Sequence, residues 1–477
     1  MMRHFFILLL AVVSIAHASD SLTQTRIETH LLAPKEAPKL LDTNGSKTVQ
    51  PQIGLLKPVQ EYPVSTSTIG LILPLSGPYA VYGERVLITV QMALGMPFVK
   101  FNGRPFMVQT NGNLNLVIGD SRADVHVAEN LVQDLLIKHQ VIAILGDLLV
   151  DSSIGVAKKS QELSVVNLSL SRVEGLTGVG SWVFRLGLTT SKQTHALVER
   201  MITVRSLKKF AVLYPTHPYG IEMKDSFIKE VKRLGGEVTV VVPYQPSETT
   251  FMNHVGQLGH RFFAKNPDYQ ACVQQAKNLT DAMRIRKAEE KCKDLVMPQV
   301  NFDVLFIPDF PKTVSYVVPT LVAQDFLVSQ NEQIVKSYHK RAKDVRPIQL
   351  LGPSSWNGDL LMQRLGDQIE GALFVDGVNW ASTNPQMAPF LTQYKQLAHG
   401  DPSLIEAQAY DAARLLRFLL ETSELKNLIK TRLDLQKALL QIKNFTGLTG
   451  PISLDASGDS AAPLSWFVFE KGQLRAL

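Results

Sequence analysis

The fold is decided by the stretch Thr68-Ile69-Gly70-Leu71-Ile72-Leu73-Pro74-Leu75-Ser76-Gly77-Pro78-Tyr79-Ala80-Val81-Tyr82-Gly83. Its first half is a short apolar run without charge, which is typical of a strand that is covered on both faces of a parallel sheet. Pro74, Ser76, Gly77 and Pro78 then end the strand with turn-forming residues. Strand, turn and helix in this order predict the kind of junction at which open α/β sheets bind ligands.

The N-terminal segment predicts export from the cytoplasm. Residues 1–18 carry Arg3, then an apolar run, then Ala16-His17-Ala18, which has the small-x-small pattern of a signal-peptidase site. The apolar run is shorter than the roughly 20 residues that a membrane-spanning helix needs, and no later segment is long and apolar enough to span a membrane. Residues 19–65 are rich in Pro, Thr, Ser and Lys, which predicts a flexible tail.

Composition and motifs narrow the class of protein. A chain of 477 residues with 45% hydrophobic content can bury two cores of ordinary domain size. The net charge of +6 is mild, and no basic run indicates a nucleic-acid-binding surface. Neither a Gly-x-Ser-x-Gly nucleophile elbow nor a His-Glu-x-x-His zinc motif occurs. We therefore predict a protein that is not an enzyme, with no catalytic residue, metal or cofactor.

From residue 67 onward, short apolar runs alternate with helical patterns. The predicted strands are residues 69–73, 114–119, 141–145, 164–168, 182–186, 210–214, 237–243, 304–308, 348–351 and 372–375. This alternation predicts right-handed βαβ units and parallel sheets. Because the strands exceed one comfortable open sheet of this type, we predict an α/β fold with two doubly wound lobes. Near the C-terminus, residues 447–459 predict a strand and a tight turn, with 466–469 as the antiparallel partner.

Residues 251–300 interrupt this alternation with polar, helix-favouring sequence, which predicts a helical insertion. The segment holds both cysteines of the chain, Cys272 and Cys292. In an oxidising compartment a disulfide is favoured over two free thiols. On one straight helix the two residues would lie about 30 Å apart, whereas a disulfide needs Cα atoms within about 7 Å. A bond therefore predicts a helix–turn–helix hairpin.

The order of several motifs resembles a known family. The motifs lie at residues 69–83, 119–124, 143–147, 183–185, 211–214 with 218–220, 351–353, 409–412 and 446–450. Across residues 66–477 their order resembles the type I periplasmic binding proteins of the leucine/isoleucine/valine-binding class. The resemblance implies two lobes joined by three crossovers, with a solute clamped between the lobes by hinge closure.

The resemblance also implies the domain boundaries. Crossovers after Arg185, after Val375 and before Gly447 place residues 66–187 and 376–445 in one lobe. The other lobe then holds residues 188–375 and 446–477, including the insertion at 251–300. Residues 301–310, 350–352, 369–377 and 406–411 look like a subgroup described as penicillin-binding protein activators.

In the amino-acid binders of this class, a Ser-rich loop after the third strand and a Thr after the fourth hold the ligand carboxylate with hydroxyls and helix N-terminal amides. The corresponding hydroxyls here belong to Ser152, Ser153, Ser169 and Ser171. Asp151 would repel a ligand carboxylate by roughly 1–4 kcal/mol at a separation of about 4 Å. The alternative interpretation is that Asp151 or Ser152 caps a helix over residues 154–162.

The ammonium-binding Glu of the family is expected after Leu351-Gly352-Pro353, where this chain has Ser354-Ser355-Trp356. Either another acid, Asp309 or Asp151, supplies the counter-charge, or the ligand is not a free α-amino acid. We favour the second interpretation.

Aromatic residues and one arginine complete the set of candidates. Tyr79, Tyr82, Tyr219, Phe310 and Trp356 fall at strand-to-helix turns, where aromatic rings line clefts, although some of them can instead pack on their own lobe. Arg172 is the cationic candidate for an anionic ligand, and its alternative is a surface charge. The predicted ligand-binding residues are Ser76, Tyr79, Tyr82, Asp151, Ser152, Ser153, Ser169, Ser171, Arg172, Tyr219, Phe310, Ser354 and Trp356.

These features together predict a soluble periplasmic solute-binding protein. It would trap a small polar solute, an amino acid or a peptide-like molecule, for an ABC permease or for sensing. The alternative is a regulator that activates penicillin-binding proteins in peptidoglycan synthesis by protein contact.

Overall fold

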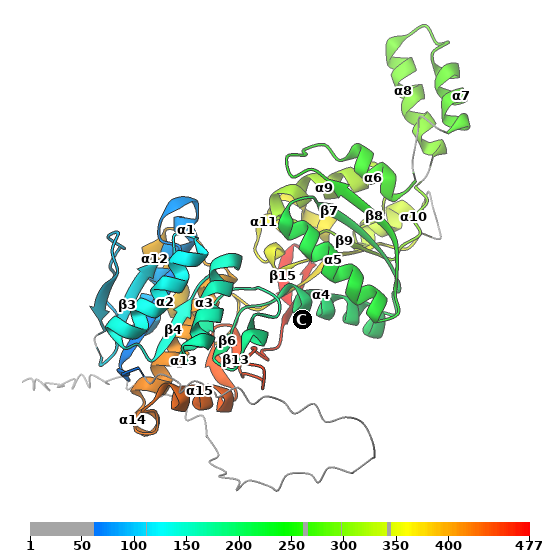
Figure 1. Ribbon diagram of the computed structural model, residues 1–477. Coiled ribbons are helices and arrows are strands. Elements are labelled where there is room, and N and C mark those ends of the chain that lie inside the picture. The colour runs from blue at the N-terminus through cyan, green and yellow to red at the C-terminus, as the bar shows by residue number, and fades with distance from the viewer. Residues whose placement is uncertain (1–61, 111, 261–265, 297, 341–344) are drawn as a thin grey trace, which may run out of the picture. The chain divides into compact units, whose positions relative to one another are not determined.

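The computed structural model describes residues 62–477 apart from 111, 261–265, 297 and 341–344. The predicted signal peptide at 1–18 and all but the end of the predicted tail at 19–65 lie outside the described residues. Strands and helices alternate along the rest of the chain and form two mainly parallel sheets with helices packed against them (Figure 1).

The first sheet has the strand order β2-β3-β1-β4-β5-β6. Its strands are β1 (Thr68–Leu73), β2 (Phe106–Gln109), β3 (Asn115–Asp120), β4 (Ala143–Gly146), β5 (Val166–Ser169) and β6 (Val183–Arg185). β1 pairs in parallel with β3 and β4 and every one of its residues is buried, as its uncharged apolar sequence predicts. The edge strand β2 runs antiparallel to β3 and was not predicted from the sequence.

Helices from two distant parts of the chain pack on this sheet. They are η1 (Gly77–Tyr79), α1 (Ala80–Leu94), α2 (Val125–His139), α3 (Val150–Glu162) and η2 (Leu176–Val179), followed much later by α12 (Met387–Ala398), α13 (Leu404–Glu421), α14 (Ser423–Lys426) and α15 (Arg432–Gln441). Asp124 caps α2 by accepting a hydrogen bond from the Val127 N–H, and Ser403 with Glu406 forms a capping box on α13. Leu71 of β1 and Leu416 of α13 belong to one buried core.

The second sheet has the strand order β15-β14-β11-β10-β9-β7-β8. Its strands are β7 (Lys209–Pro215), β8 (Glu237–Tyr244), β9 (Val304–Phe306), β10 (Gln349–Gly352), β11 (Leu373–Asp376), β14 (Ser465–Glu470) and β15 (Gln473–Ala476). β14 is antiparallel to both β11 and β15. The expected pairing of residues 466–469 with the 447–459 segment is therefore wrong, since β13 (Gly450–Ile452) pairs with β12 (Phe445–Gly447) instead.

The helices on the second sheet surround an aromatic core. They are α4 (Thr190–Glu199), the π-helical turn η3 (Arg200–Val204), α5 (Pro218–Arg233), α6 (Met252–Leu258), α9 (Pro311–Ala323), α10 (Glu332–His339), η6 (Ser354–Trp356), α11 (Leu360–Leu365) and η7 (Gly366–Ile369). The Phe227 ring stacks on Phe306 at 4.2 Å between centroids, and its edge meets Phe210 at 5.8 Å. These contacts attach α5 to β7 and β9.

Between α6 and β9 the chain forms a helical hairpin. α7 (Pro267–Ala276) and α8 (Ala282–Cys292) lie side by side in Figure 1, and η5 (Lys293–Leu295) follows them. Cys272 and Cys292 are joined by a disulfide with their Cα atoms 5.6 Å apart. Among the described side chains of the two helices, only Ala276 and Cys292 are fully buried, so the hairpin contributes little to either sheet core.

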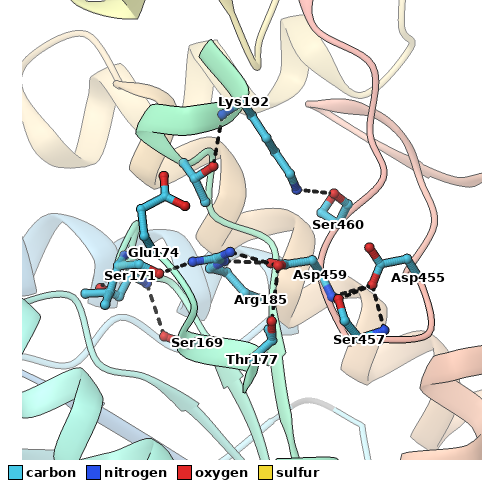
Figure 2. Close-up of polar contacts among 12 residues, drawn as sticks. Ser169, Ser171, Glu174, Thr177, Arg185, Lys192, Asp455, Ser457, Asp459 and Ser460 are labelled. Atoms are coloured by element: carbon cyan, nitrogen blue, oxygen red, sulfur yellow. Dashed lines mark hydrogen bonds and ion pairs between the residues drawn. The ribbon is translucent and has the colours of Figure 1, made fainter. Parts of the chain in front are cut away.

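An ion pair connects the end of β6 to the loop before β14. The Arg185 side chain is 2% exposed, and its Nε and Nη2 donate to Asp459 Oδ1 and Oδ2 at 2.7 and 2.8 Å. Figure 2 shows Arg185 between Ser171 and Asp459, with Thr177 donating a further hydrogen bond to Asp459 at 3.1 Å. The backbone joins the same two segments, because the Arg185 N–H donates to the Gly458 carbonyl at 2.9 Å.

A buried carboxyl group lies at the end of β11, where the chain leaves the second sheet. Asp376 Oδ2 accepts a hydrogen bond from the Asn357 amide at 2.7 Å, and Oδ1 accepts one from the Gly377 N–H at 2.6 Å. Burial nevertheless raises the pKa of Asp376 to about 7 from its ordinary value of 3.8.

We expect Asp459→Ala to lower the free energy of unfolding by about 3–5 kcal/mol, because it leaves a buried guanidinium without its counter-charge. Urea unfolding followed by circular dichroism measures this loss. The matched control is Asp134→Ala, which removes an exposed pair with Lys138 at 2.9 Å and should cost less than about 1 kcal/mol. Equal losses in the two variants would contradict a stabilising role for the buried pair.

We expect the stability of the protein to depend on pH through Asp376. The folded state holds the Asp376 proton more tightly than the unfolded chain does, so this contribution is full below about pH 4 and is lost as the pH rises toward 7. The side chain of Asp376→Asn cannot ionise, so the variant does not lose this contribution. As the pH rises from about 4 to 7, the free energy of unfolding of the wild type should therefore fall relative to that of the variant, by at most about 4 kcal/mol. Urea titrations at pH 4.5 and 7.5 test this, and a wild-type-to-variant difference that is the same at both values would refute it.

Candidate functional site

The loop after β1 brings one group of candidates to the carboxyl edge of the first sheet. Ser76 lies at the start of this loop and is partly exposed, while Tyr79 and Tyr82 are 44% and 56% exposed. Asp120 at the end of β3 fixes the loop by accepting a hydrogen bond from the Leu75 N–H at 2.8 Å. A Cβ atom on Gly83 would lie 2.1 Å from the Pro74 carbonyl oxygen, so only glycine lets α1 begin so close to the strand end.

The loop after β4 places charged and hydroxyl groups in different environments. Asp151 is exposed in the first turn of α3, where its charge complements the helix dipole. Ser152 and Ser153 are fully buried, and among the described residues Ser153 Oγ has no hydrogen-bond partner. Neither Asp151 nor Ser152 caps the helix, because α3 starts at Val150 after Leu149, earlier than the 154–162 segment suggests.

Asp147 is a buried acid in this loop that was not among the predicted site residues. Its side chain is fully buried, and Oδ1 accepts a hydrogen bond from the Leu148 N–H at 2.5 Å. Burial raises the pKa of Asp147, which favours the protonated form. A charged residue directly after the apolar run of β4 was the signal that could have found it.

The loop after β5 contains the next candidates. Ser169 and Ser171 are buried, and their Oγ atoms accept hydrogen bonds from the Ser171 and Val173 N–H groups at 3.2 and 3.4 Å. Both hydroxyls therefore order the loop, which lies beside Arg185 in Figure 2. Arg172 follows them with about half of its side chain exposed.

Two aromatic candidates meet at the carboxyl edge of the second sheet. Tyr219 in the first turn of α5 and Phe310 after β9 have ring centroids 5.7 Å apart. The His217 ring stacks near Tyr219 at 6.1 Å between centroids, a contact that the sequence did not suggest. Burial raises the pKa of Tyr219 to about 12, so its hydroxyl stays neutral at physiological pH.

Asp309 lies directly before Phe310 and is buried. Its Oδ2 accepts a hydrogen bond from the Tyr244 hydroxyl at 2.6 Å, and its Oδ1 accepts one from the Phe310 N–H at 2.7 Å. Both carboxylate oxygens therefore accept hydrogen bonds from the protein itself, and these bonds hold the loop after β9 in place.

The two candidates after β10 are less accessible. The Ser354 N–H donates to Gln193 Oε1 at 3.0 Å, and the Ser354 side chain is partly buried. Trp356 is completely buried, and its Nε1 donates to the Asp309 carbonyl at 3.1 Å. Its indole lies so close to Gly352 that a Cβ there would be 2.0 Å from indole Cδ2. The structure thus places Trp356 in the core beneath the sheet edge.

Three candidates from different strands come together. The Arg172 guanidinium carbon is 4.8 Å from the centroid of the Tyr219 ring, which in turn contacts Phe310. Glu222, which the sequence analysis did not select, approaches Arg172 with its Oε2 4.0 Å from Nη2. We call Arg172, Tyr219 and Phe310 the guanidinium–aromatic cluster. It offers a cation for a carboxylate and ring faces for an apolar group.

Comparison with known proteins supports the fold assignment. A family model described as periplasmic binding protein matches residues 66–284. No curated protein matches the chain.

Several solved structures share the fold over most of the chain. A leucine-binding protein, LivK, from Thermotoga maritima has 19% identity and a TM-score of 0.52, covering 86% of this chain and 97% of that one. A putative branched-chain amino acid ABC transporter protein from Rhodospirillum rubrum has 18% identity and a TM-score of 0.60, covering 86% and 99%. A solute-binding protein of an ABC transporter from R. palustris, in complex with 4-hydroxybenzoate, has 18% identity and a TM-score of 0.53, covering 86% and 95%.

These similarities establish the architecture. The chain has the two-lobed α/β fold of type I periplasmic binding proteins, with parallel-dominated sheets. In the described part of the chain, no helix combines the length and the apolar character required to cross a membrane.

Proposed function

We propose that this two-lobed protein is a periplasmic solute-binding protein whose ligand contacts the guanidinium–aromatic cluster. The observation that carries the proposal is that Arg172 follows a strand of the first sheet, whereas Tyr219 and Phe310 follow strands of the second. The carboxyl edges of parallel strands are where α/β proteins bind ligands. With this function we propose lobes of residues 66–187 plus 376–445 and 188–375 plus 446–477.

The cluster favours a monocarboxylate with an apolar or aromatic body over a free α-amino acid. Arg172 can hold a carboxylate with two parallel hydrogen bonds, and the Tyr219 and Phe310 rings can cover the apolar part. An ammonium group would need an acid, yet Ser354 and Ser355 stand where the family has Glu. Glu222, the acid beside the cluster, already faces Arg172 at 4.0 Å and accepts a hydrogen bond from the Thr190 hydroxyl at 2.6 Å. Asp309 is already committed to Tyr244 and the Phe310 N–H, which leaves it poorly placed to replace that Glu.

The proposed mechanism is non-enzymatic. A ligand that contacts residues of both lobes binds the closed state more tightly than the open state, and this difference in affinity drives closure. An ABC permease that recognises the closed protein would then receive the solute.

We expect purified protein to bind aromatic monocarboxylates in preference to leucine, isoleucine and valine. At a concentration 100 times its Kd, a ligand adds about 2.7 kcal/mol to the stability of the folded state, which a thermal-shift assay detects. Benzoate, 4-hydroxybenzoate and phenylacetate are suitable probes. If the three amino acids shift the melting temperature and the acids do not, the ligand assignment is wrong.

We expect Arg172→Gln to weaken binding of the best carboxylate by at least about tenfold, because a neutral amide loses the charge-assisted hydrogen bonds. Phe310→Ala should weaken binding as well, through loss of apolar contact. The matched control is Arg104→Gln, which neutralises an exposed arginine far along the sequence from the cluster. Isothermal titration calorimetry measures all three, and equal affinities for Arg172→Gln and Arg104→Gln would contradict the assignment.

A second candidate function is activation of a penicillin-binding protein by protein contact, and the hairpin α7–α8 favours it. Met283 is 83% exposed on α8, and Arg284, Arg286 and Lys287 are exposed next to it. An exposed apolar side chain among cations suits an acidic protein surface. Pull-down of a purified penicillin-binding protein that is lost in Arg284→Glu/Arg286→Glu/Lys287→Glu would support this function, whereas equal capture by the triple variant would contradict it.

A further inference from the structure

A cavity that is widely open to solvent lies at the opposite edge of the second sheet from the guanidinium–aromatic cluster. It has a volume of about 630 Å³ and is lined by residues that precede β7, begin α10 and begin β10. These residues are Arg205, Leu207, Gln330, Glu332, Val335, Arg346, Pro347 and Gln349. Because β7 and β10 are parallel, their amino ends share one edge, and Tyr219 and Phe310 follow the carboxyl ends of strands at the other. The cavity is therefore distinct from the proposed solute site.

The Arg205 guanidinium is held in place by a buried amide. Its Nη1 donates to Gln349 Oε1 at 2.7 Å, and Gln330 Nε2 donates to the same oxygen at 2.9 Å. Gln349 is itself fixed, since its Nε2 donates to the Leu350 and Gly371 carbonyls at 2.9 and 2.8 Å. The guanidinium is thus positioned at the wall of the cavity, and none of the described residues accepts a hydrogen bond from its other N–H groups.

The charge around the cavity is positive and incompletely neutralised. In the portion of the chain covered by the structure, neither Arg205 nor Arg346 forms an ion pair with a carboxylate. Burial lowers the pKa of Arg205, and the nearby charge of Arg200 lowers it further. Glu332 also lines the cavity, but its Oε2 is 3.3 Å from Lys336 Nζ. An anion in the cavity would offset the positive charge of Arg205.

The remaining wall is apolar, formed by Leu207, Val335 and Pro347. Cationic donors and apolar side chains around a cavity of this volume fit a small organic molecule with one acidic group. We propose that this cavity binds an organic anion, with its phosphate or carboxylate on Arg205 and Arg346 and its apolar part against Leu207, Val335 and Pro347. The ligand binds whether or not the solute site is occupied.

The test uses calorimetric titration of the full mature chain with phenyl phosphate and, separately, with phenylsuccinate, in low-salt buffer. The two probes distinguish a phosphate ligand from a carboxylate ligand. We expect at least one probe to bind with a sub-millimolar Kd. Arg205→Gln and Arg346→Gln should each weaken that binding at least about fivefold, and the double variant should abolish it. Inorganic phosphate should bind more weakly than phenyl phosphate, because it lacks the apolar part.

Two control variants separate this site from other causes. Arg104→Gln neutralises an exposed arginine elsewhere and should bind the probe as wild type does. Arg172→Gln disables the proposed solute site, so it removes any binding of these aromatic probes there and should keep the binding at the cavity. Circular dichroism melts establish that the Arg205 and Arg346 variants are folded. The proposal is overturned if neither probe binds, if folded Arg205→Gln/Arg346→Gln binds as wild type does, or if Arg172→Gln abolishes the binding.

Discussion

The buried ion pair of Arg185 with Asp459 is the interaction on which the rest of the architecture depends. A guanidinium that is 2% exposed cannot be left without a partner, and the carboxylate that satisfies it comes from a loop 274 residues later. Gly458 and Ser460 flank that carboxylate and form backbone hydrogen bonds with Arg185, so charge and backbone fix the same junction. Lys192 donates to the Ser460 carbonyl nearby, and the same stretch then continues into β14. The end of the first sheet and the last strands of the second are thereby tied to a single point.

The sequence predicted most of the parallel strands because burial on both faces leaves a continuous apolar run, as in β1 and β4. It missed β2, a short edge strand whose Met107 and Gln109 face solvent, because partial exposure removes that signal. It also mispaired the last strands, since an apolar run does not say which distant strand lies beside it. The pairing of Arg185 with Asp459 was not predicted, because two opposite charges that lie 274 residues apart leave no local pattern in the sequence.

The candidate site could be predicted only to the level of loops. Phe310 and Trp356 both follow buried strands, yet Phe310 is 53% exposed and Trp356 is completely buried. The difference lies in the packing: Gly352 leaves room for the indole to turn inward, and the Asp309 carbonyl accepts its N–H. Similarly, the hydroxyls of Ser169 and Ser171 accept hydrogen bonds from their own loop, while Arg172, the next residue, reaches Tyr219. Which side chain of a loop faces outward is decided by contacts that sequence position alone does not encode.

The disulfide-closed hairpin marks a position where this fold accepts an inserted segment of chain. β8 and β9 both pair with β7, so the chain between them can leave the sheet and return without breaking any strand pair. The Cys272–Cys292 bond cross-links the inserted segment. It stabilises the folded hairpin by roughly 3 kcal/mol, because it lowers the conformational entropy of the unfolded segment. The connection after α6 is accordingly a modular position, where a lineage can lengthen, exchange or delete an appendage while the two sheets keep their strand order.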